Sequence, residues 1–170
     1  MKAVQQYSSE RTSINSGKVP QAFTTYQDKI GFVPRSLILD YGGGKFDTAV
    51  EYMARYGSKV LIYDKYNRTA EHNKMVMTAV RHRKPDYIVC CNVLNVIQEN
   101  NVVELVVRTI KRLSGANTVV IFKIHEGDGS GHGRPTGPTQ YQRNQKTDAY
   151  LPLIWKYFPN AIKKYGLIIA

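Results

Sequence analysis

Leu37-Ile38-Leu39-Asp40-Tyr41-Gly42-Gly43-Gly44-Lys45-Phe46-Asp47 is the stretch of this 170-residue chain that best indicates its fold. A short apolar run ends in an acid, three glycines follow, and a helical pattern then begins. This order predicts a buried strand, a tight turn and a helix N-terminus. Glycines lack a Cβ atom, so a ligand can approach the backbone closely, and the first N–H groups of a helix are free to bind it. We expect a turn that holds a nucleotide or nucleoside; the simpler alternative is a strand-to-helix turn without a ligand.

The spacing of the glycines argues against two common phosphate-binding turns. A P-loop requires G-x-x-x-x-G-K-[ST], but Lys45 is not followed by Ser or Thr. Gly42 and Gly44 fit the dinucleotide pattern G-x-G-x-x-G, but Asp47 takes the place of the third glycine. An aspartate there would repel a pyrophosphate. The turn therefore favours a ligand without a phosphate.

The pattern D-x-G-x-G-x-G remains, and Asp40, Gly42 and Gly44 match it, while Phe46 replaces the last glycine. On these residues the chain resembles the class I S-adenosylmethionine-dependent methyltransferases. The resemblance implies S-adenosylmethionine as the cofactor. It also implies an α/β, Rossmann-like methyltransferase fold, a mainly parallel sheet with helices on both faces.

Asp64 ends the next expected strand and lies about 20 residues past the glycine turn. An acid at this distance binds ribose hydroxyls in the related dinucleotide folds, because a carboxylate can accept from both the 2′- and 3′-hydroxyls. The alternative is a solvated aspartate in the turn Asp64-Lys65-Tyr66-Asn67.

A second signature is Tyr87-Ile88-Val89-Cys90-Cys91-Asn92-Val93-Leu94-Asn95-Val96-Ile97, a strand that ends in a polar residue and a turn. It is similar to the strand-four segment of the same family, which implies that Asn92 and Asn95 face the site. The motifs of the amino-methylating and cytosine-C5 DNA enzymes are absent. The resemblance implies that the cofactor is held by Asp40, Tyr41, Gly42, Gly43, Gly44, Asp64, Lys65, Asn92 and Val93.

A weaker resemblance links the chain to putative methyltransferases found in phages and beside DNA phosphorothioation genes. It is carried by Glu10-Arg11-Thr12, Asp40-Tyr41-Gly42 and the segment 92–97. That family's substrate does not follow from the resemblance.

Strands alternate with helices along the chain, which predicts a parallel sheet within a single domain. An N-terminal arm and helix, residues 1–35, would pack on a methyltransferase-like domain, residues 36–170. Strands are expected at 36–40, 59–63, 87–91, 118–124 and 165–169, and helices at 20–29, 46–56, 70–83, 100–113 and 148–158. The strand three of the usual fold has no clear candidate, and one strand of the usual terminal hairpin is missing, so the sheet is expected to lack part of the usual set.

The glycine-rich segment from Glu126 to Thr139 is too long for a plain connection and predicts a lid or a binding loop. Candidates for a catalytic role are Asn95, His125 and Asp128, which lie at or beyond the expected carboxyl ends of strands. No group of His and Cys has the spacing of a zinc site, so no metal is expected.

The formal net charge of +11 favours polyanionic partners. A nucleic acid could bind through Arg81, Arg83, Lys84 and Arg134; the alternative is a solvated basic surface. The two cysteines are adjacent, and no apolar run predicts a signal peptide or a membrane span. We therefore expect a cytoplasmic protein with reduced thiols. The leading interpretation is a methyltransferase, and the rival is a noncatalytic module that binds nucleic acid or senses the cofactor.

Overall fold

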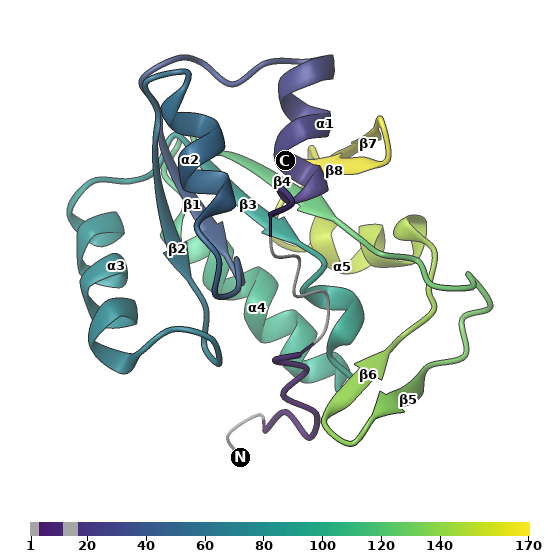
Figure 1. The fold of residues 1–170 in the computed structure, drawn as a ribbon. Coiled ribbons are helices and arrows are strands. Elements are labelled where there is room, and N and C mark those ends of the chain that lie inside the picture. The colour runs from purple at the N-terminus through teal and green to yellow at the C-terminus, as the bar shows by residue number, and fades with distance from the viewer. Residues whose placement is uncertain (1–3, 12–16) are drawn as a thin grey trace.

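A six-stranded sheet organises the computed structural model, which describes residues 4–11 and 17–170 (Figure 1). The strand order is β2 (Lys59–Tyr63), β1 (Leu37–Tyr41), β3 (Tyr87–Cys91), β4 (Val119–Lys123), β8 (Leu167–Ile169) and β7 (Ile162–Lys164). The first four strands are parallel, whereas β8 is antiparallel to β4 and β7 is antiparallel to β8. The carboxyl ends of β1, β2 and β3 therefore meet at one edge of the sheet.

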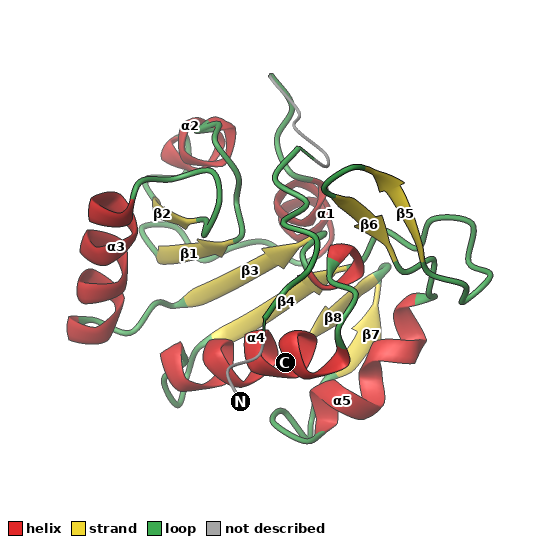
Figure 2. Cartoon of the chain, turned by 90° about the horizontal axis from the view of Figure 1, so that it is seen from below, coloured by secondary structure: helices red, strands yellow, loops and turns green. Residues whose placement is uncertain are grey.

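Helices cover both faces of the sheet, as Figure 2 shows. One face is covered by α1 (Gln21–Lys29) and α2 (Thr48–Ala54), and the other by α3 (Ala70–His82), α4 (Asn100–Leu113) and α5 (Leu151–Trp155). Successive strand residues point to opposite faces, so Ile38 packs with α1 and α2 while Leu39 packs with α4. The α/β, Rossmann-like architecture predicted from the sequence is confirmed.

The end of the chain differs from the prediction of one terminal strand. Residues 162–164 form β7, which pairs with β8 as an antiparallel hairpin. Its residues Ile162, Lys163 and Lys164 are all exposed, so this edge strand lacks the alternation of apolar residues from which a strand is predicted.

The last helix starts later than residue 148. A 3₁₀ turn, η2 (Thr147–Tyr150), precedes α5, and Pro152 falls in the first turn of α5. Proline is tolerated there because the first N–H groups of a helix have no intrahelical partner. The expected long loop contains a strand, β5 (Arg134–Gly137), which pairs with β6 (Gln140–Gln142), directly after the loop, in a separate hairpin.

Between β2 and β3 the chain forms α3 and no strand, which agrees with the lack of a clear candidate for strand three in the sequence. As a result, β2 is an edge of the sheet. Side chains from α3 bind its outer backbone groups. His72 Nε2 lies 2.8 Å from the carbonyl oxygen of Ile62. The Asn73 amide accepts from the N–H of Asp64 at 3.1 Å and donates to its carbonyl at 2.8 Å. Within residues 4–11 and 17–170, no helix is both long and apolar enough to cross a membrane.

Candidate functional site

A cavity of about 460 Å³ lies at the carboxyl ends of β1, β2 and β3. It is bounded by the glycine turn after β1, by the turns after β2 and β3, and by segments that precede β1. All nine residues predicted to bind the cofactor line it: Asp40, Tyr41, Gly42, Gly43, Gly44, Asp64, Lys65, Asn92 and Val93. The structure therefore brings together residues that are up to about fifty positions apart, and their role in binding stays a prediction.

The glycine turn packs too closely on its neighbours to accept side chains. A Cβ atom on Gly42 would lie 2.3 Å from Cγ2 of Val93, and one on Gly43 would lie 2.4 Å from Oδ2 of Asp40. Gly42 also has a φ angle of +83°, which side chains disfavour. A Cβ atom on Gly44 would meet no atom within 4 Å. The first two glycines allow the turn to pack, and the third leaves space beside the backbone.

Asp64 holds this turn in place from the end of β2. Its Oδ2 accepts from the N–H of Gly44 at 2.9 Å, and its Oδ1 accepts from the N–H groups of Tyr66 and Asn67 at 2.9 and 2.8 Å. Arg68 adds a bond from Nε to the carbonyl of Gly44 at 2.8 Å. Because a carboxylate oxygen has two lone pairs, Oδ2 can still accept from one ligand hydroxyl. The carboxylate thus has a structural role that the sequence analysis did not predict.

Asp64→Ala should therefore destabilise the protein without any ligand. The substitution leaves backbone N–H groups of the turn without their acceptor, at a cost of about 2–4 kcal/mol. For a chain of this length, this corresponds to a melting temperature lower by roughly 4–16 °C. Thermal unfolding of the ligand-free protein measures the effect. A melting temperature equal to that of the unaltered protein would show that Asp64 does not hold the turn.

Asp40 is the buried acid of the cavity. It is 1% exposed, and neither of its carboxylate oxygens has a hydrogen-bond partner in the described part of the chain. Burial, together with the negative charge of Asp64, raises the pKa of Asp40 to about 7, against a smaller opposing effect of Arg68. Oδ1 of Asn92 is also buried and unpartnered. Buried acceptors almost always have donors, so these atoms are suited to a ligand that donates.

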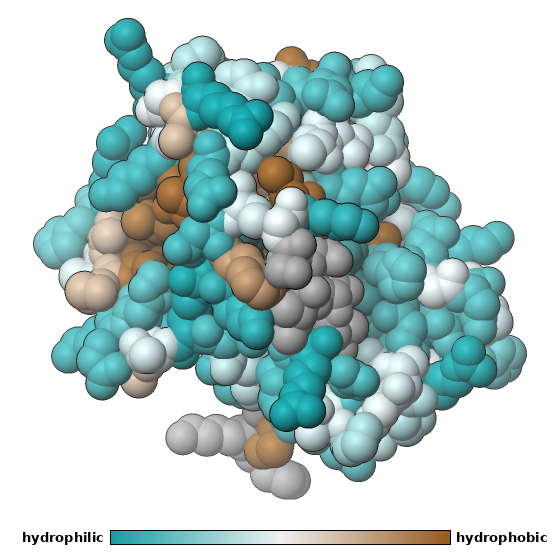
Figure 3. Space-filling view, viewed as in Figure 1, coloured by the Kyte–Doolittle hydropathy of each residue, from teal (hydrophilic) through white to brown (hydrophobic). Residues whose placement is uncertain are grey.

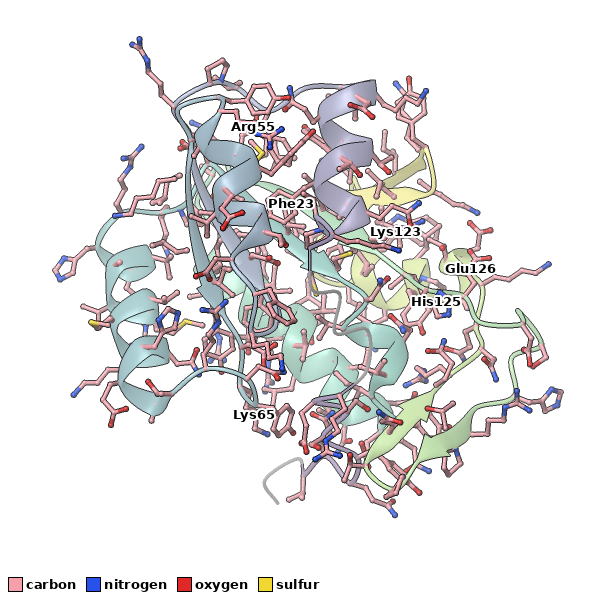
Figure 4. The ribbon with its side chains drawn as sticks, viewed as in Figure 1. Phe23, Arg55, Lys65, Lys123, His125 and Glu126 are labelled. Atoms are coloured by element: carbon pink, nitrogen blue, oxygen red, sulfur yellow. The ribbon has the colours of Figure 1, made fainter. Side chains whose placement is uncertain are left out.

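The three residues predicted to be catalytic do not line this cavity. Asn95 donates from Nδ2 to Oε1 of Gln142 at 3.1 Å, and Gln142 donates from Nε2 to the backbone carbonyl of His125 at 2.9 Å. The His125 side chain is exposed (Figure 4), and Asp128 is exposed and accepts from the N–H of Ser130 at 2.9 Å. Their catalytic roles stay predictions that this placement does not favour.

The loop predicted as a lid also lies outside the lining. Its residues support the N-terminal arm instead: the N–H of Ser9 donates to the carbonyl of Thr139 at 2.7 Å. Arg134, the fourth residue of the predicted basic surface, is exposed on β5. The hairpin of β5 and β6 therefore lies outside the cavity and contacts the segment that covers it.

That cover is the arm of residues 4–11, which the sequence analysis did not predict as part of the site. Gln5, Ser8, Ser9 and Glu10 line the cavity. Ser9 Oγ donates to the carbonyl of Val96 at 3.0 Å, and Oε1 of Gln5 accepts from the hydroxyl of Tyr66 at 2.9 Å. The arm thus spans the ends of β2 and β3.

Glu10 was singled out in the motif Glu10-Arg11-Thr12, although no role was assigned to it. In the structure Glu10 lines the cavity, Arg11 is exposed, and Thr12 lies outside the described residues. Cys91, at the end of β3, is a further lining residue that was interpreted only as a core thiol. Burial, the largest effect, raises the pKa of its thiol to about 12, so at neutral pH it is not a thiolate nucleophile.

Solved structures with a similar architecture include two methyltransferases. One is the 1,6-didemethyltoxoflavin-N1-methyltransferase of Burkholderia thailandensis with bound S-adenosylhomocysteine: the TM-score is 0.63, the identity 15%, and the match covers 87% of this chain and 73% of that one. The other is the mitomycin 7-O-methyltransferase MmcR, with a TM-score of 0.53, 12% identity, and coverage of 87% of this chain and 51% of that one.

The chain has a methyltransferase fold. No protein-family model matches it, and no curated protein sequence is significantly similar. At 15% and 12% identity the likeness establishes the fold alone, so the chemistry of this methyltransferase fold is argued below from the chain's own residues.

Proposed function

We propose that the chain is a methyltransferase that uses S-adenosylmethionine. The observation that carries the proposal is the buried, unpartnered carboxylate of Asp40 beside a glycine turn that opens into the cavity. A second and third carboxylate, from Asp64 and Glu10, line the same cavity. Lys18, Lys45 and Lys65 line it as well, so the formal charges of the lining balance. The preference for a ligand that carries positive charge therefore rests on the buried carboxylate of Asp40. The similar fold that binds S-adenosylhomocysteine supports the same reading.

The residues of the cavity fit each part of this cofactor. Asp40 would face a cationic group, and the remaining lone pair of Asp64 Oδ2 would accept from a ribose hydroxyl. The apolar side chains of Val93, Val96 and Ile97 line the cavity and would contact the adenine ring. When bound, the cofactor supplies a methyl group activated by a sulfonium. The chain's own contribution is to orient the two reactants and to exclude water with the arm.

Glu10 is the ionisable residue of the arm that would stand nearest the acceptor. Its carboxylate accepts from the hydroxyl of Ser8, and both residues line the cavity. A carboxylate at this place can orient an amine or hydroxyl acceptor and take its proton. Because the arm covers the cavity, we favour a small molecule, or a single group that protrudes from a larger one, over a base within a duplex.

Calorimetry with S-adenosylhomocysteine tests the cofactor site. The unaltered protein should bind it, and Gly42→Leu should abolish binding because the new side chain would collide with Val93. Gly57→Ala is the matched control: Gly57 also has a positive φ angle, +69°, but does not line the cavity. It should lose stability and keep its affinity within about twofold.

The absence of binding to the unaltered protein at millimolar concentration would refute the proposal. If binding is found, transfer of a labelled methyl group to fractionated cell extract tests catalysis. Binding without transfer to any fraction would favour the rival, a noncatalytic cofactor sensor on the same fold.

A further inference from the structure

A band of basic side chains lies at the amino ends of the parallel strands, at the edge of the sheet opposite the cavity. We name this band the basic rim. Its residues come from helix C-termini, from the turns that lead into β1 and β3, and from the start of β2, and all are exposed: Lys29, Arg35, Arg55, Lys59, Arg81, Arg83, Lys84, Lys111 and Arg112. In Figure 4, Arg55 lies at the upper end of the molecule and Lys65, which lines the cavity, at the lower end.

Hydrogen bonds join segments of the rim in two pairs. The N–H of Arg35 donates to the carbonyl of Tyr56 at 3.2 Å, which links the turn before β1 to the end of α2. Lys84 Nζ donates to the carbonyl of Arg112 at 2.9 Å, which links the turn before β3 to the end of α4. The upper edge of the molecule is mostly hydrophilic in the space-filling view (Figure 3).

Few carboxylates offset this charge. The same segments hold two acidic residues, Asp28 and Asp86. Oδ2 of Asp86 accepts from the N–H of Leu37 at 2.7 Å and lies 3.5 Å from the guanidinium of Arg83, so this carboxylate offsets the charge of one rim residue.

Helix dipoles explain only part of the rim. Lys29, Arg81 and Lys111 stand in the last turns of helices, where a positive charge is favourable. Arg35 and Lys84 stand in turns outside any helix. The rim therefore carries more positive charge than the helix ends account for.

We propose that the basic rim binds the phosphate backbone of a nucleic acid. A row of Lys and Arg side chains neutralises successive phosphates and releases their counterions, which is the main source of sequence-independent affinity. The rim includes Arg81, Arg83 and Lys84 of the surface predicted from the sequence, whereas Arg134 lies on β5 and is not part of it.

An anionic membrane is the competing polyanion, and the structure disfavours it. Membrane-surface helices need a free apolar face, but the apolar face of α1, with Ala22, Phe23 and Tyr26, is buried against the sheet. Ile30 and Val33 are exposed beside the rim as single side chains, which is normal for a soluble surface.

The rim is separate from the cofactor cavity. β1 is five residues long, so the strand ends are about 17 Å apart. The proposal therefore does not depend on the proposed function, and its test does not use methyl transfer. A nucleic acid on the rim would be held by the protein without its bases entering the cavity.

Fluorescence anisotropy with a labelled 20-nucleotide DNA, as single strand and as duplex, tests the rim over a range of salt from about 50 to about 200 mM. A rim variant combines Lys59→Gln, Arg81→Gln and Lys111→Gln. A control variant removes the same charge elsewhere with Lys74→Gln, Lys146→Gln and Lys164→Gln. For the rim variant, the slope of log affinity against log salt should fall by about two to three, because each lost phosphate contact lowers it by about one. The control should change it by less than one.

Equal losses in the two variants would overturn the proposal, since net charge alone would then explain binding. The proposal would also be overturned if the unaltered protein did not bind DNA at low salt. It would be overturned as well if the protein bound phosphatidylserine vesicles more tightly than DNA, and if the rim variant lost this binding while the control variant kept it. Saturating S-adenosylhomocysteine should leave DNA affinity unchanged within about twofold; competition between the two would place the DNA in the cavity and not on the rim.

Discussion

Asp40→Asn is expected to stabilise the ligand-free protein at about pH 8 by up to about 4 kcal/mol and to weaken the binding of S-adenosylhomocysteine at least thirtyfold. Both effects follow from one buried carboxylate that has no partner within the described residues. An ionised acid in that position costs free energy when the cavity is empty. The same charge attracts the ammonium group of S-adenosylhomocysteine, and truncation of one partner of a buried charge pair costs about 2–5 kcal/mol of binding.

The pH dependence gives this prediction its direction. The pKa of Asp40 is raised to about 7 in the folded protein, whereas the pKa of an aspartate in an unfolded chain is about 4. Between these values the folded state binds more protons, so this group makes stability fall as pH rises from about 4 to about 7 and then level off. Three pKa units correspond to about 4 kcal/mol. The Asn variant should lack this contribution and should match the unaltered protein at about pH 4.

Urea unfolding at several pH values, with calorimetry of S-adenosylhomocysteine, measures both effects. Below about pH 7, the affinity of the unaltered protein should increase up to tenfold for each unit by which the pH is raised, because a larger fraction of Asp40 is then ionised. Asp28→Asn is the control, because Asp28 is exposed and distant from the cavity. Equal stability of the Asp40 variant and the unaltered protein at about pH 8 would show that the carboxylate is satisfied by a partner, such as water.

Deletion of residues 1–10 is expected to raise the dissociation constant of S-adenosylhomocysteine about thirtyfold. The deletion removes Gln5, Ser8, Ser9 and Glu10 from the lining of the cavity. A lost cover that contributes about 2 kcal/mol changes affinity by this factor, and most of the change should appear as faster dissociation. Within residues 4–11, Ser9 is the buried residue, so the truncated protein should still fold.

Release of tritiated S-adenosylhomocysteine into an excess of unlabelled compound measures the dissociation rate. Ser9→Ala loses the bond from Oγ to the carbonyl of Val96 and should shift the rate in the same direction by about threefold to tenfold. Gln6→Ala is the control, because the exposed Gln6 contacts Glu99 through its backbone N–H and does not line the cavity. An unchanged rate after deletion would mean that the arm does not cover the bound cofactor.

The sequence was most informative where local patterns decide the structure. β2 and β3 have the bounds predicted for them, and α3 differs by one residue. The residues around Asp40, Asp64 and Asn92 meet in one cavity, because parallel strands place their carboxyl ends at one edge of the sheet. The family resemblance named the cofactor residues, and this topological rule explains why they lie together.

The arm could not be predicted because its contacts join distant parts of the chain. Ser9 bonds to Val96 and Thr139, and no periodicity within residues 4–11 indicates these partners. Asn95 does not line the cavity for a related reason. It lies in a 3₁₀ turn, η1 (Leu94–Val96), and its side chain donates to Gln142 of β6, a short strand directly after the glycine-rich segment that the sequence did not predict. β7 was missed because its exposed sequence lacks an apolar face.

The contacts of His72 and Asn73 with β2 also bear on self-association. An edge strand normally presents free N–H and C=O groups that another chain can extend into an aggregate. Here the outward groups of Ile62 and Asp64 are already bound by side chains of α3, and at the opposite edge β7 carries Lys163 and Lys164. At β2, a strand from another molecule would have to displace the side chains of α3 from the backbone. At β7, it would have to approach the positive charges of Lys163 and Lys164. Aggregation by strand addition is thus opposed at both margins of the sheet, by hydrogen bonding at one and by electrostatic repulsion at the other.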